Sequence, residues 1–287
     1  ATTVRTLLSA SSTTDTAYYS DSNVVDVTSF GARGDGVTDD TKAFQEAWQE
    51  VCGKGSTTLH VPTGYRFLVA PVNFSGPCQS NIFFKVDGRI IAKLNARDWD
   101  SKFLEWINFS KLNGFSVIGS GIFDGQGAAW WKISQYADED NSKGGSNLQS
   151  VGPTALRFYG SDDVSVQGIT IRNSPQTHLK FDSCTCVKVF RVKISSPANS
   201  PNTDGIHLQN SRDVEIHHSS MACGDDCVSI QTGCSGIRVH NINCGPGNGI
   251  SIGGLGKDGT KACVSNVSVY DSNIQNALNG VRIKTWQ

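Results

Sequence analysis

The sequence has no excess of charge of either sign and no long apolar run. Its 25 lysine and arginine residues face 26 aspartate and glutamate residues, which gives a formal net charge of -1 over 287 residues. A chain this close to neutral has no global positive field to attract nucleic acid, so a nucleic-acid partner is not expected. No stretch approaches the roughly 20 consecutive apolar residues that cross a bilayer, so association with a membrane is not expected either.

The sequence also lacks the spacing of a metal site. Its nine cysteines include no CxxC pair and no Cys/His set with zinc spacing, and its aspartates lack calcium-loop spacing, so no metal or cofactor is predicted. Nine cysteines together with three glycosylation sequons, which begin at Asn73, Asn108 and Asn266, instead favour disulfides, N-linked glycans and a secreted, extracellular protein. The odd number of cysteines leaves one thiol free, or means that its partner cysteine is missing from this chain.

The apolar spacing typical of an amphipathic helix occurs once in the sequence. Residues 1–22 are rich in Ser, Thr and Ala and predict a flexible N-terminal arm or the remnant of a propeptide, whereas residues 23–287 predict a single, monomeric domain. In that domain, Thr38-Asp39-Asp40 supplies helix-capping chemistry, and one apolar face follows at helical spacing, made of Ala43, Phe44, Ala47, Trp48 and Val51. The rest of the domain predicts short strands and turns.

Internal repeats predict how these strands are arranged. Two series of short apolar strands interleave: one holds residues 206–209, 228–231, 250–253 and 281–284, and the other holds 164–166, 187–189, 214–216, 237–239 and 267–269. Such series describe stacked coils, so we predict an all-β, single-stranded, right-handed parallel β-helix with a short N-terminal capping helix. The alternative, two unrelated sandwich domains, does not explain why the two series stay in phase.

Outward positions of the first series predict a binding face. Alternation along a strand turns Ile206 and Leu208 inward and leaves His207 and Gln209 outward, and Gln231 is outward in the same column as Gln209 on the next coil. A floor of small and amide-bearing side chains suits a groove for a sugar chain. The alternative is an ordinary solvated face.

Three carboxylates converge just before these strands. Asp204 and Asp226 hold the same position on neighbouring coils, about 4.8 Å apart, and Asp225 adjoins them. Like charges this close raise one another's pKa, which serves glycoside hydrolysis because that reaction needs one protonated and one ionised carboxyl. The alternative is turn capping, which accounts well for the equivalent Asn279.

Two cations face the same patch. Arg282 and Lys284 alternate with inward apolar residues on the last repeat, so both point outward. They can bind the carboxylates of an acidic polymer, or they can pair with the chain's own aspartates. Spacing alone leaves both possibilities open.

Four ordered segments resemble the signature motifs of glycoside hydrolase family 28, the polygalacturonases. They are Asn202-Thr203-Asp204, Gly224-Asp225-Asp226, Gly247-Asn248-Gly249 and Arg282-Ile283-Lys284. Three further stretches, residues 30–36, 124–131 and 174–181, resemble the plant branch, and the resemblance covers about residues 24–287. It implies a pectin-lyase-like β-helix and an inverting hydrolase that cuts α-1,4 links in homogalacturonan, the acidic backbone of pectin, without a cofactor.

The resemblance also implies roles. Asp225 would be the general acid, Asp204 and Asp226 would activate water, and Arg282 and Lys284 would hold the galacturonate carboxylate. Further substrate contacts are expected from five residues: Asn248, His178, Lys180, Gln209 and Gln231.

Two features depart from the family pattern. Asn248 stands where the family has a histidine, and an asparagine cannot titrate near neutral pH. The chain also stops at Gln287, soon after the fourth motif, so the domain is expected to be truncated at its C-terminal end. The alternative hypothesis is therefore an impaired homologue that binds pectin or a protein partner, such as a proteinaceous inhibitor. A third is an enzyme for rhamnose-containing pectin.

Cysteine positions suggest three disulfides. Cys52 ends the predicted helix and Cys78 follows a loop, which makes them a plausible pair. By resemblance, Cys227 pairs with Cys244. Cys234 with Cys263 is a further candidate, and Cys184, Cys186 and Cys223 cannot be assigned partners from sequence.

Overall fold

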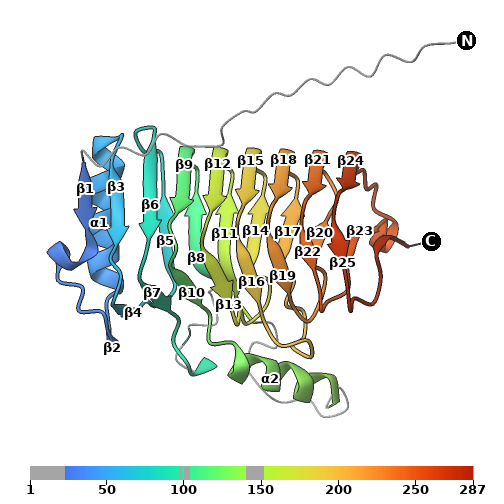
Figure 1. Ribbon diagram of the computed structural model, residues 1–287, viewed down its shortest axis with the longest axis horizontal. Coiled ribbons are helices and arrows are strands. Elements are labelled where there is room, and N and C mark those ends of the chain that lie inside the picture. Colours follow the sequence, from blue (N-terminus) through green and yellow to red (C-terminus); the bar gives the residue numbers. More distant parts are fainter. Residues whose placement is uncertain (1–22, 97–98, 100–103, 140–151, 287) are drawn as a thin grey trace, which may run out of the picture.

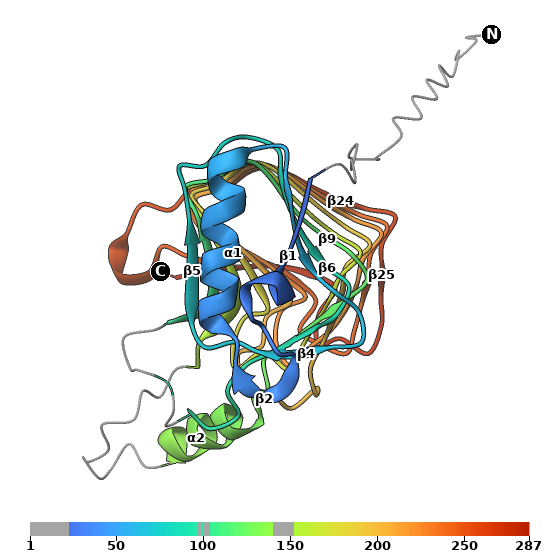
Figure 2. The same cartoon turned by 90° about the vertical axis from the view of Figure 1, so that its left-hand side faces the viewer.

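The computed structural model describes residues 23–96, 99, 104–139 and 152–286, so the predicted arm at 1–22 lies outside the described part of the chain. The described residues wind into stacked coils, and each coil contributes strands to three parallel sheets (Figure 1). Viewed along the stack, the coils superimpose and α1 (Thr41–Lys54) lies across one end (Figure 2). The right-handed parallel β-helix and its capping helix are confirmed.

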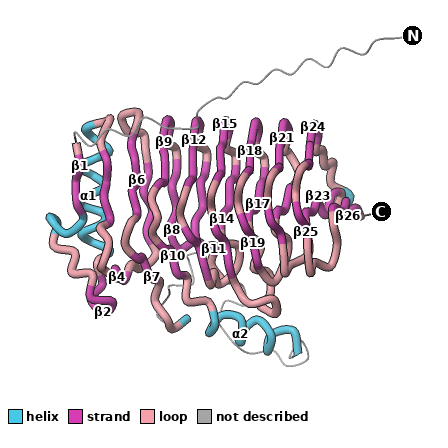
Figure 3. Tube along the Cα trace, viewed as in Figure 1, coloured by secondary structure: helices cyan, strands magenta, loops and turns pink. Residues whose placement is uncertain are grey.

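The strands are short, and loops form the corners between the sheets (Figure 3). The first sheet contains β1 (Val24–Asp26), β3 (Thr58–Val61), β6 (Ile82–Val86), β9 (Asn113–Ile118), β12 (Asp162–Gln167), β15 (Thr185–Phe190), β18 (Arg212–His217), β21 (Ser235–His240) and β24 (Ser265–Tyr270). The second contains β2 (Asp35–Asp39), β4 (Arg66–Leu68), β7 (Arg89–Ile91), β10 (Ile122–Asp124), β13 (Thr170–Arg172), β16 (Lys193–Ser195), β19 (Ser220–Ala222), β22 (Asn243–Cys244) and β25 (Asn273–Ile274). The third contains β5 (Val72–Ser75), β8 (Glu105–Ser110), β11 (Thr154–Tyr159), β14 (Leu179–Asp182), β17 (Ile206–Gln209), β20 (Val228–Ile230), β23 (Ile250–Leu255) and β26 (Val281–Thr285).

The two predicted strand series are the third and first sheets. In the third sheet Ile206, Val228, Ile250 and Val281 are in register, as the gapless repeat required. The second sheet was not predicted, because its strands hold only two or three residues after β4 and leave too few positions to show alternation. On the last coil, Val281 and Ile283 keep the register but are exposed, since no further coil covers them among the described residues.

Stacked inward side chains form the core. In the third sheet Phe74, Phe109, Phe158 and Phe181 pack ring against ring, with centroids 5.5, 5.0 and 4.9 Å apart along the series. All four are fully buried. Burying such a side chain is worth about 1.5–3 kcal/mol, so each coil stabilises the next through this column.

The corners repeat a left-handed backbone. Between the third and first sheets, Ser183, Asn210 and Gly233 have φ of 58°, 48° and 79° on successive coils. Asn and Gly adopt this region more readily than other residues, which explains the Asn- and Gly-rich turns of the sequence. At Gly233 an added Cβ would lie 2.3 Å from Asn210 Oδ1, so only glycine fits there.

Helix α1 buries the apolar face predicted for it, including Phe44, Trp48 and Val51. Its cap differs in detail, because the Asp40 carboxylate accepts hydrogen bonds from the backbone N–H groups of Arg33 and Gly34 rather than from the helix. Asp39 Oδ1 accepts from the Thr41 N–H at 3.1 Å instead.

Short helical turns also interrupt the loops, among them η1 (Val27–Phe30) and η3 (Lys257–Gly259). A second α-helix, α2 (Ala128–Glu139), was not predicted and lies outside the coils (Figure 1). It is held through Trp130, which is buried against Trp99 with ring centroids 5.9 Å apart. No helix in the described part of the chain is both long and apolar enough to span a lipid bilayer.

Candidate active site

The predicted carboxylates lie on the loops that join the second sheet to the third. Asp204 precedes β17, Asp225 and Asp226 precede β20, and Asn248 precedes β23. Backbone hydrogen bonds keep these loops in register, because Asp226 O accepts from the Gly205 N–H at 2.8 Å and Asp225 O accepts from the Asn248 N–H at 2.8 Å. The stacking of the coils therefore brings the three carboxylates together on neighbouring rungs.

Asp226 is the buried member of the group, with 2% of its side chain exposed. Its Oδ1 is 2.8 Å from Arg282 Nη2 and its Oδ2 is 2.9 Å from Lys284 Nζ. The Ser251 hydroxyl also donates to Oδ1 at 2.7 Å and accepts from Arg282 Nε at 2.7 Å. Of the two partners left open by spacing, the chain's own aspartate is the one these cations contact.

Asp225 is partly exposed, and one of its oxygens is occupied. Its Oδ1 accepts from the Asp226 N–H and from Asn248 Nδ2, each at 2.8 Å. No contact to Oδ2 is found among the described residues. Oδ2 is therefore the oxygen that can carry a proton toward a ligand.

Asp204 has 15% of its side chain exposed, and His207 Nδ1 lies 3.2 Å from its Oδ2. Burial raises the pKa of Asp204 above the usual aspartate range. The nearby charges of Asp225 and Asp226 raise this pKa further, whereas the hydrogen bond and charge of His207 lower it. Asp204 thus holds a proton more readily than an exposed aspartate does.

His178 does not line a groove, contrary to the sequence expectation. It is fully buried, its Nδ1 donates to the Asp204 carbonyl at 2.8 Å, and its Nε2 accepts from the Ser196 hydroxyl at 2.7 Å. The error arose because His178 sits in the corner before β14, where the alternation of a strand does not apply. Burial lowers its pKa to about 4, so the ring is neutral and supports the loop of Asp204 from behind.

The other predicted contacts lie on the outer face of the third sheet. Lys180 on β14 is half-buried and pairs in register with His207, and Gln209 pairs with Asp182. Gln231 Nε2 donates to Ser229 Oγ at 2.8 Å and to the Gly253 carbonyl at 2.9 Å. These side chains share a face with the carboxylates, and their contacts with a substrate remain a prediction.

Sequence reasoning assigned no role to two residues that contact the carboxylates. His207 faces Asp204, and the fully buried Ser251 bridges Asp226 and Arg282. Both occupy outward positions in the strand series immediately after the carboxylate column. This position, the outward residue that follows the carboxylate column on each coil, is the sequence signal that could have identified them.

Two disulfides are present. Cys227 and Cys244 are joined directly after Asp226, and Cys52 is joined to Cys78 at the capping helix. Cys234 and Cys263, the third suggested pair, are separate thiols. Cys234 is buried, whereas Cys263 is exposed on the loop before β24, where its carbonyl accepts a hydrogen bond from the Gly233 N–H at 2.8 Å.

Known proteins resemble this chain in sequence and in fold. Residues 52–287 match the sequence profile of Glycosyl hydrolases family 28. A probable polygalacturonase of Arabidopsis thaliana is 41% identical over 271 residues, covering 94% of this chain and 56% of the relative. A polygalacturonase of Cryptomeria japonica is 42% identical over 265 residues, covering 92% and 51%. The chain thus spans about half the length of these relatives.

The fold is also found among solved structures. The crystal structure of an exopolygalacturonase from Thermotoga maritima superposes with a TM-score of 0.75 at 23% identity, covering 92% of this chain and 69% of the other. At this identity the likeness concerns the fold alone.

Proposed function

The chain belongs to glycosyl hydrolase family 28, and from this premise we propose that it hydrolyses α-1,4-galacturonosidic bonds in homogalacturonan with inversion of configuration. The observation that carries the proposal is the cluster of three carboxylates on neighbouring rungs, with Asp226 held by Arg282 and Lys284. Relatives named polygalacturonases support the choice of substrate.

Asp225 serves as the general acid. Its Oδ1 is fixed by two donors while Oδ2 is left for a proton, and protonation of the departing glycosidic oxygen by such a group contributes about 10²–10⁴-fold to the rate. Asp204 and Asp226 orient and deprotonate the attacking water. Inversion requires the acid and the base to stand roughly 6.5–9.5 Å apart so that this water fits between them.

The cations have capacity left for a substrate carboxylate. Arg282 uses Nε and Nη2 for Ser251 and Asp226, and a guanidinium has further donors on Nη1. The side chains of Arg282 and Lys284 are 26% and 36% exposed. They neutralise Asp226 from one side and present positive charge to galacturonate from the other.

We place this activity outside the cell, in the cell wall, within one monomeric domain over residues 23–287 that acts without a cofactor. Two disulfides and three sequons support a secretory route, because disulfides persist in oxidising compartments. An acidic polysaccharide is the expected partner.

The test is release of new reducing ends from polygalacturonic acid. Asp225→Asn keeps the size of the side chain but cannot donate the proton, so the rate should fall by about 10²–10⁴-fold. Asp213→Asn is the matched control, because Asp213 is exposed on the first sheet and its φ of 54° also suits asparagine. Full activity of Asp225→Asn would refute the assignment. Release from rhamnogalacturonan alone would favour the rhamnose-containing substrate.

A second candidate function is binding of pectin, or of a protein such as an inhibitor, without cleavage. Asn248 favours it, because its amide holds Asp225 Oδ1 where the family pattern has a histidine, and an asparagine cannot take up or release a proton near neutral pH. Asn248→His, which restores the residue the family pattern has there, separates the two. Substantial and equal activity in both proteins would dismiss the binding-only function, and activity only in Asn248→His would support it.

A further inference from the structure

One row of outward side chains runs along the third sheet from the capping helix to the carboxylates. The strand register aligns eight residues in it: Asn73, Asn108, Arg157, Lys180, His207, Ser229, Ser251 and Arg282. The first two, on β5 and β8, each begin an Asn-x-Ser sequon. The row therefore stacks two potential N-glycosylation sites directly on one another.

The two sites exclude one another sterically. Neighbouring strands of a sheet are about 4.8 Å apart, and in-register side chains on one face project in the same direction. An N-linked glycan is bulky and begins with a sugar ring wider than that spacing. At most one of Asn73 and Asn108 can carry a glycan in the folded chain.

Hydrogen bonds distinguish the two amides. Asn108 Nδ2 donates to Asn73 Oδ1 at 3.0 Å, and the Ser110 hydroxyl donates to the same oxygen at 3.1 Å. Asn108 is half-buried on β8, which has a strand on each side of it, and its Oδ1 is enclosed. Asn73 is exposed on the edge strand, and because its oxygen is occupied, its Nδ2 is the atom left to point outward.

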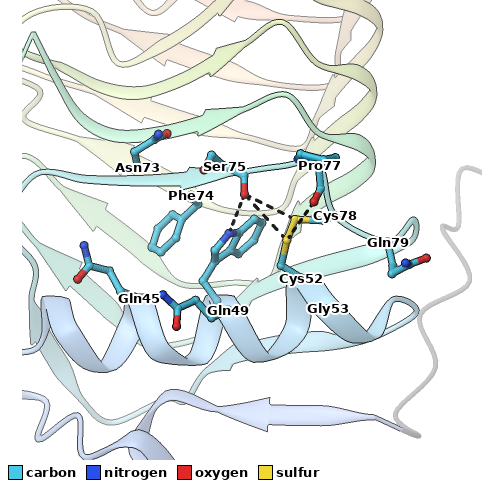
Figure 4. Close-up of a pocket in the computed structure, with 11 residues that line it drawn as sticks. Gln45, Gln49, Cys52, Gly53, Asn73, Phe74, Ser75, Pro77, Cys78 and Gln79 are labelled. Carbon is cyan, nitrogen blue, oxygen red and sulfur yellow. Dashed lines mark hydrogen bonds between the residues drawn. A yellow bond between two sulfur atoms is a disulfide. The ribbon is translucent and has the colours of Figure 1, made fainter.

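A cavity of about 760 Å³ adjoins Asn73, between α1 and β5. Three glutamines line it, Gln45, Gln49 and Gln79, as Figure 4 shows. Gln45 and Gln49 are exposed on α1, one helical turn apart. Primary amides both donate and accept hydrogen bonds, so they suit the hydroxyl and acetamido groups of an uncharged sugar.

We propose that Asn73 carries an N-linked glycan, that Asn108 does not, and that the first sugars of the glycan lie over the cavity between α1 and β5. The donor is a lipid-linked oligosaccharide of the secretory pathway. Asn73 Nδ2 forms a bond to C1 of the first N-acetylglucosamine, the bond from C1 to the lipid diphosphate breaks, and the amide loses one proton. No oxidation or reduction occurs. The proposal rests on the secretory route given under the proposed function.

The first experiment reads occupancy by mass, independently of activity. The full chain is secreted from a eukaryotic cell line and treated with peptide N-glycosidase in ¹⁸O water, which converts a glycosylated asparagine to labelled aspartate. We expect label at Asn73 and none at Asn108. Ser75→Ala, which leaves the Asn73 side chain in place, should lose this glycan, and Ser75→Thr should keep it. Label at Asn108, or at neither site, would overturn the proposal.

The second experiment tests where the glycan lies. Gln49→Ala should lower the melting temperature of the glycosylated chain and leave that of Ser75→Ala unchanged, because Gln49 then has no sugar to bind. Equal shifts in both backgrounds would show that the sugars do not contact α1. Asp225→Asn should keep the label at Asn73 whatever its hydrolytic rate, so that failure of the proposed activity and failure of this inference are read separately.

Discussion

Asn248 Nδ2 donates a hydrogen bond of 2.8 Å to Oδ1 of Asp225, one rung away in the stack. The backbone N–H of Asn248 also reaches the Asp225 carbonyl at 2.8 Å, so side chain and main chain together fix the position of this carboxylate. Asp225 is therefore held by a neutral donor where a titratable group would change charge with pH.

The first prediction concerns that contact. Asn248→Ala removes one of two donors to Asp225 Oδ1, and a hydrogen bond to a charged group is worth about 1.5–3 kcal/mol. With one donor fewer, Asp225 Oδ1 is held less firmly, so kcat on polygalacturonic acid should fall by about tenfold, which corresponds to about 1.4 kcal/mol. Asn243→Ala is the control, because Asn243 is exposed on β22 of the second sheet. An unchanged kcat would show that the contact does not position the acid.

The second prediction concerns the ion pairs of Asp226. Arg282→Met leaves a carboxylate that is 2% exposed with one cation fewer, and breaking a buried pair costs about 3–5 kcal/mol when no other partner remains. Because Lys284 stays at 2.9 Å, we expect a loss near the lower end of that range in denaturant unfolding. The double variant Asp226→Asn/Arg282→Met should recover part of the stability and none of the activity. A double variant as unstable as Arg282→Met would contradict this account.

The third prediction follows from the raised pKa of Asp204. The folded state binds this proton more tightly than the unfolded state, so the resulting stability is present below the ordinary aspartate pKa of about 3.9 and is lost as pH rises through the folded pKa. Asn cannot ionise. Asp204→Asn should therefore gain stability relative to the natural chain between pH 4 and pH 7, while it loses activity. Unfolding free energies at both pH values check this, and a relative loss on going to pH 7 would be the wrong sign.

The fourth prediction concerns His178, whose pKa burial lowers to about 4. The unfolded chain takes up a proton near pH 6.5 while the folded chain does not, so stability is complete above that pH and declines as pH falls toward 4. A difference of this size amounts to about 3 kcal/mol. His178→Gln should flatten the decline of the unfolding free energy between pH 6.5 and 4, although it lowers stability throughout. Parallel curves for the two proteins would exclude His178 as the cause.

Repetition made much of the fold predictable. A column of apolar residues such as Ile206, Val228 and Ile250 repeats because every coil meets the same neighbours, and the register of the carboxylates follows from that column. The strands of the second sheet are too short to repeat visibly. Helix α2 lies outside the coils, and Trp130 is the one buried residue among those of the helix whose side chains are described, so the helix left no extended apolar period.

The candidate site was predictable in its members and less so in its contacts. The column of Asp204 and Asp226 followed from spacing, but the direction of His178 depends on the path of a corner that no period describes. The pairing of Arg282 with Asp226 likewise depends on side chains that reach across two coils, which strand spacing does not encode. Side-chain contacts that lie in a corner or reach across two coils were thus the part that spacing could not predict.

Because the strands stack in register, the outward row of side chains stays aligned whatever the length of the loops between the strands. Ser229 and Ser251 are 22 residues apart, whereas Ser251 and Arg282 are 31 apart, yet each pair is aligned in the same way. The nine additional residues are taken up by the loop that contains η3. Insertions and deletions in these loops can therefore reshape the rim of the coils while the carboxylates and cations of this face keep their places.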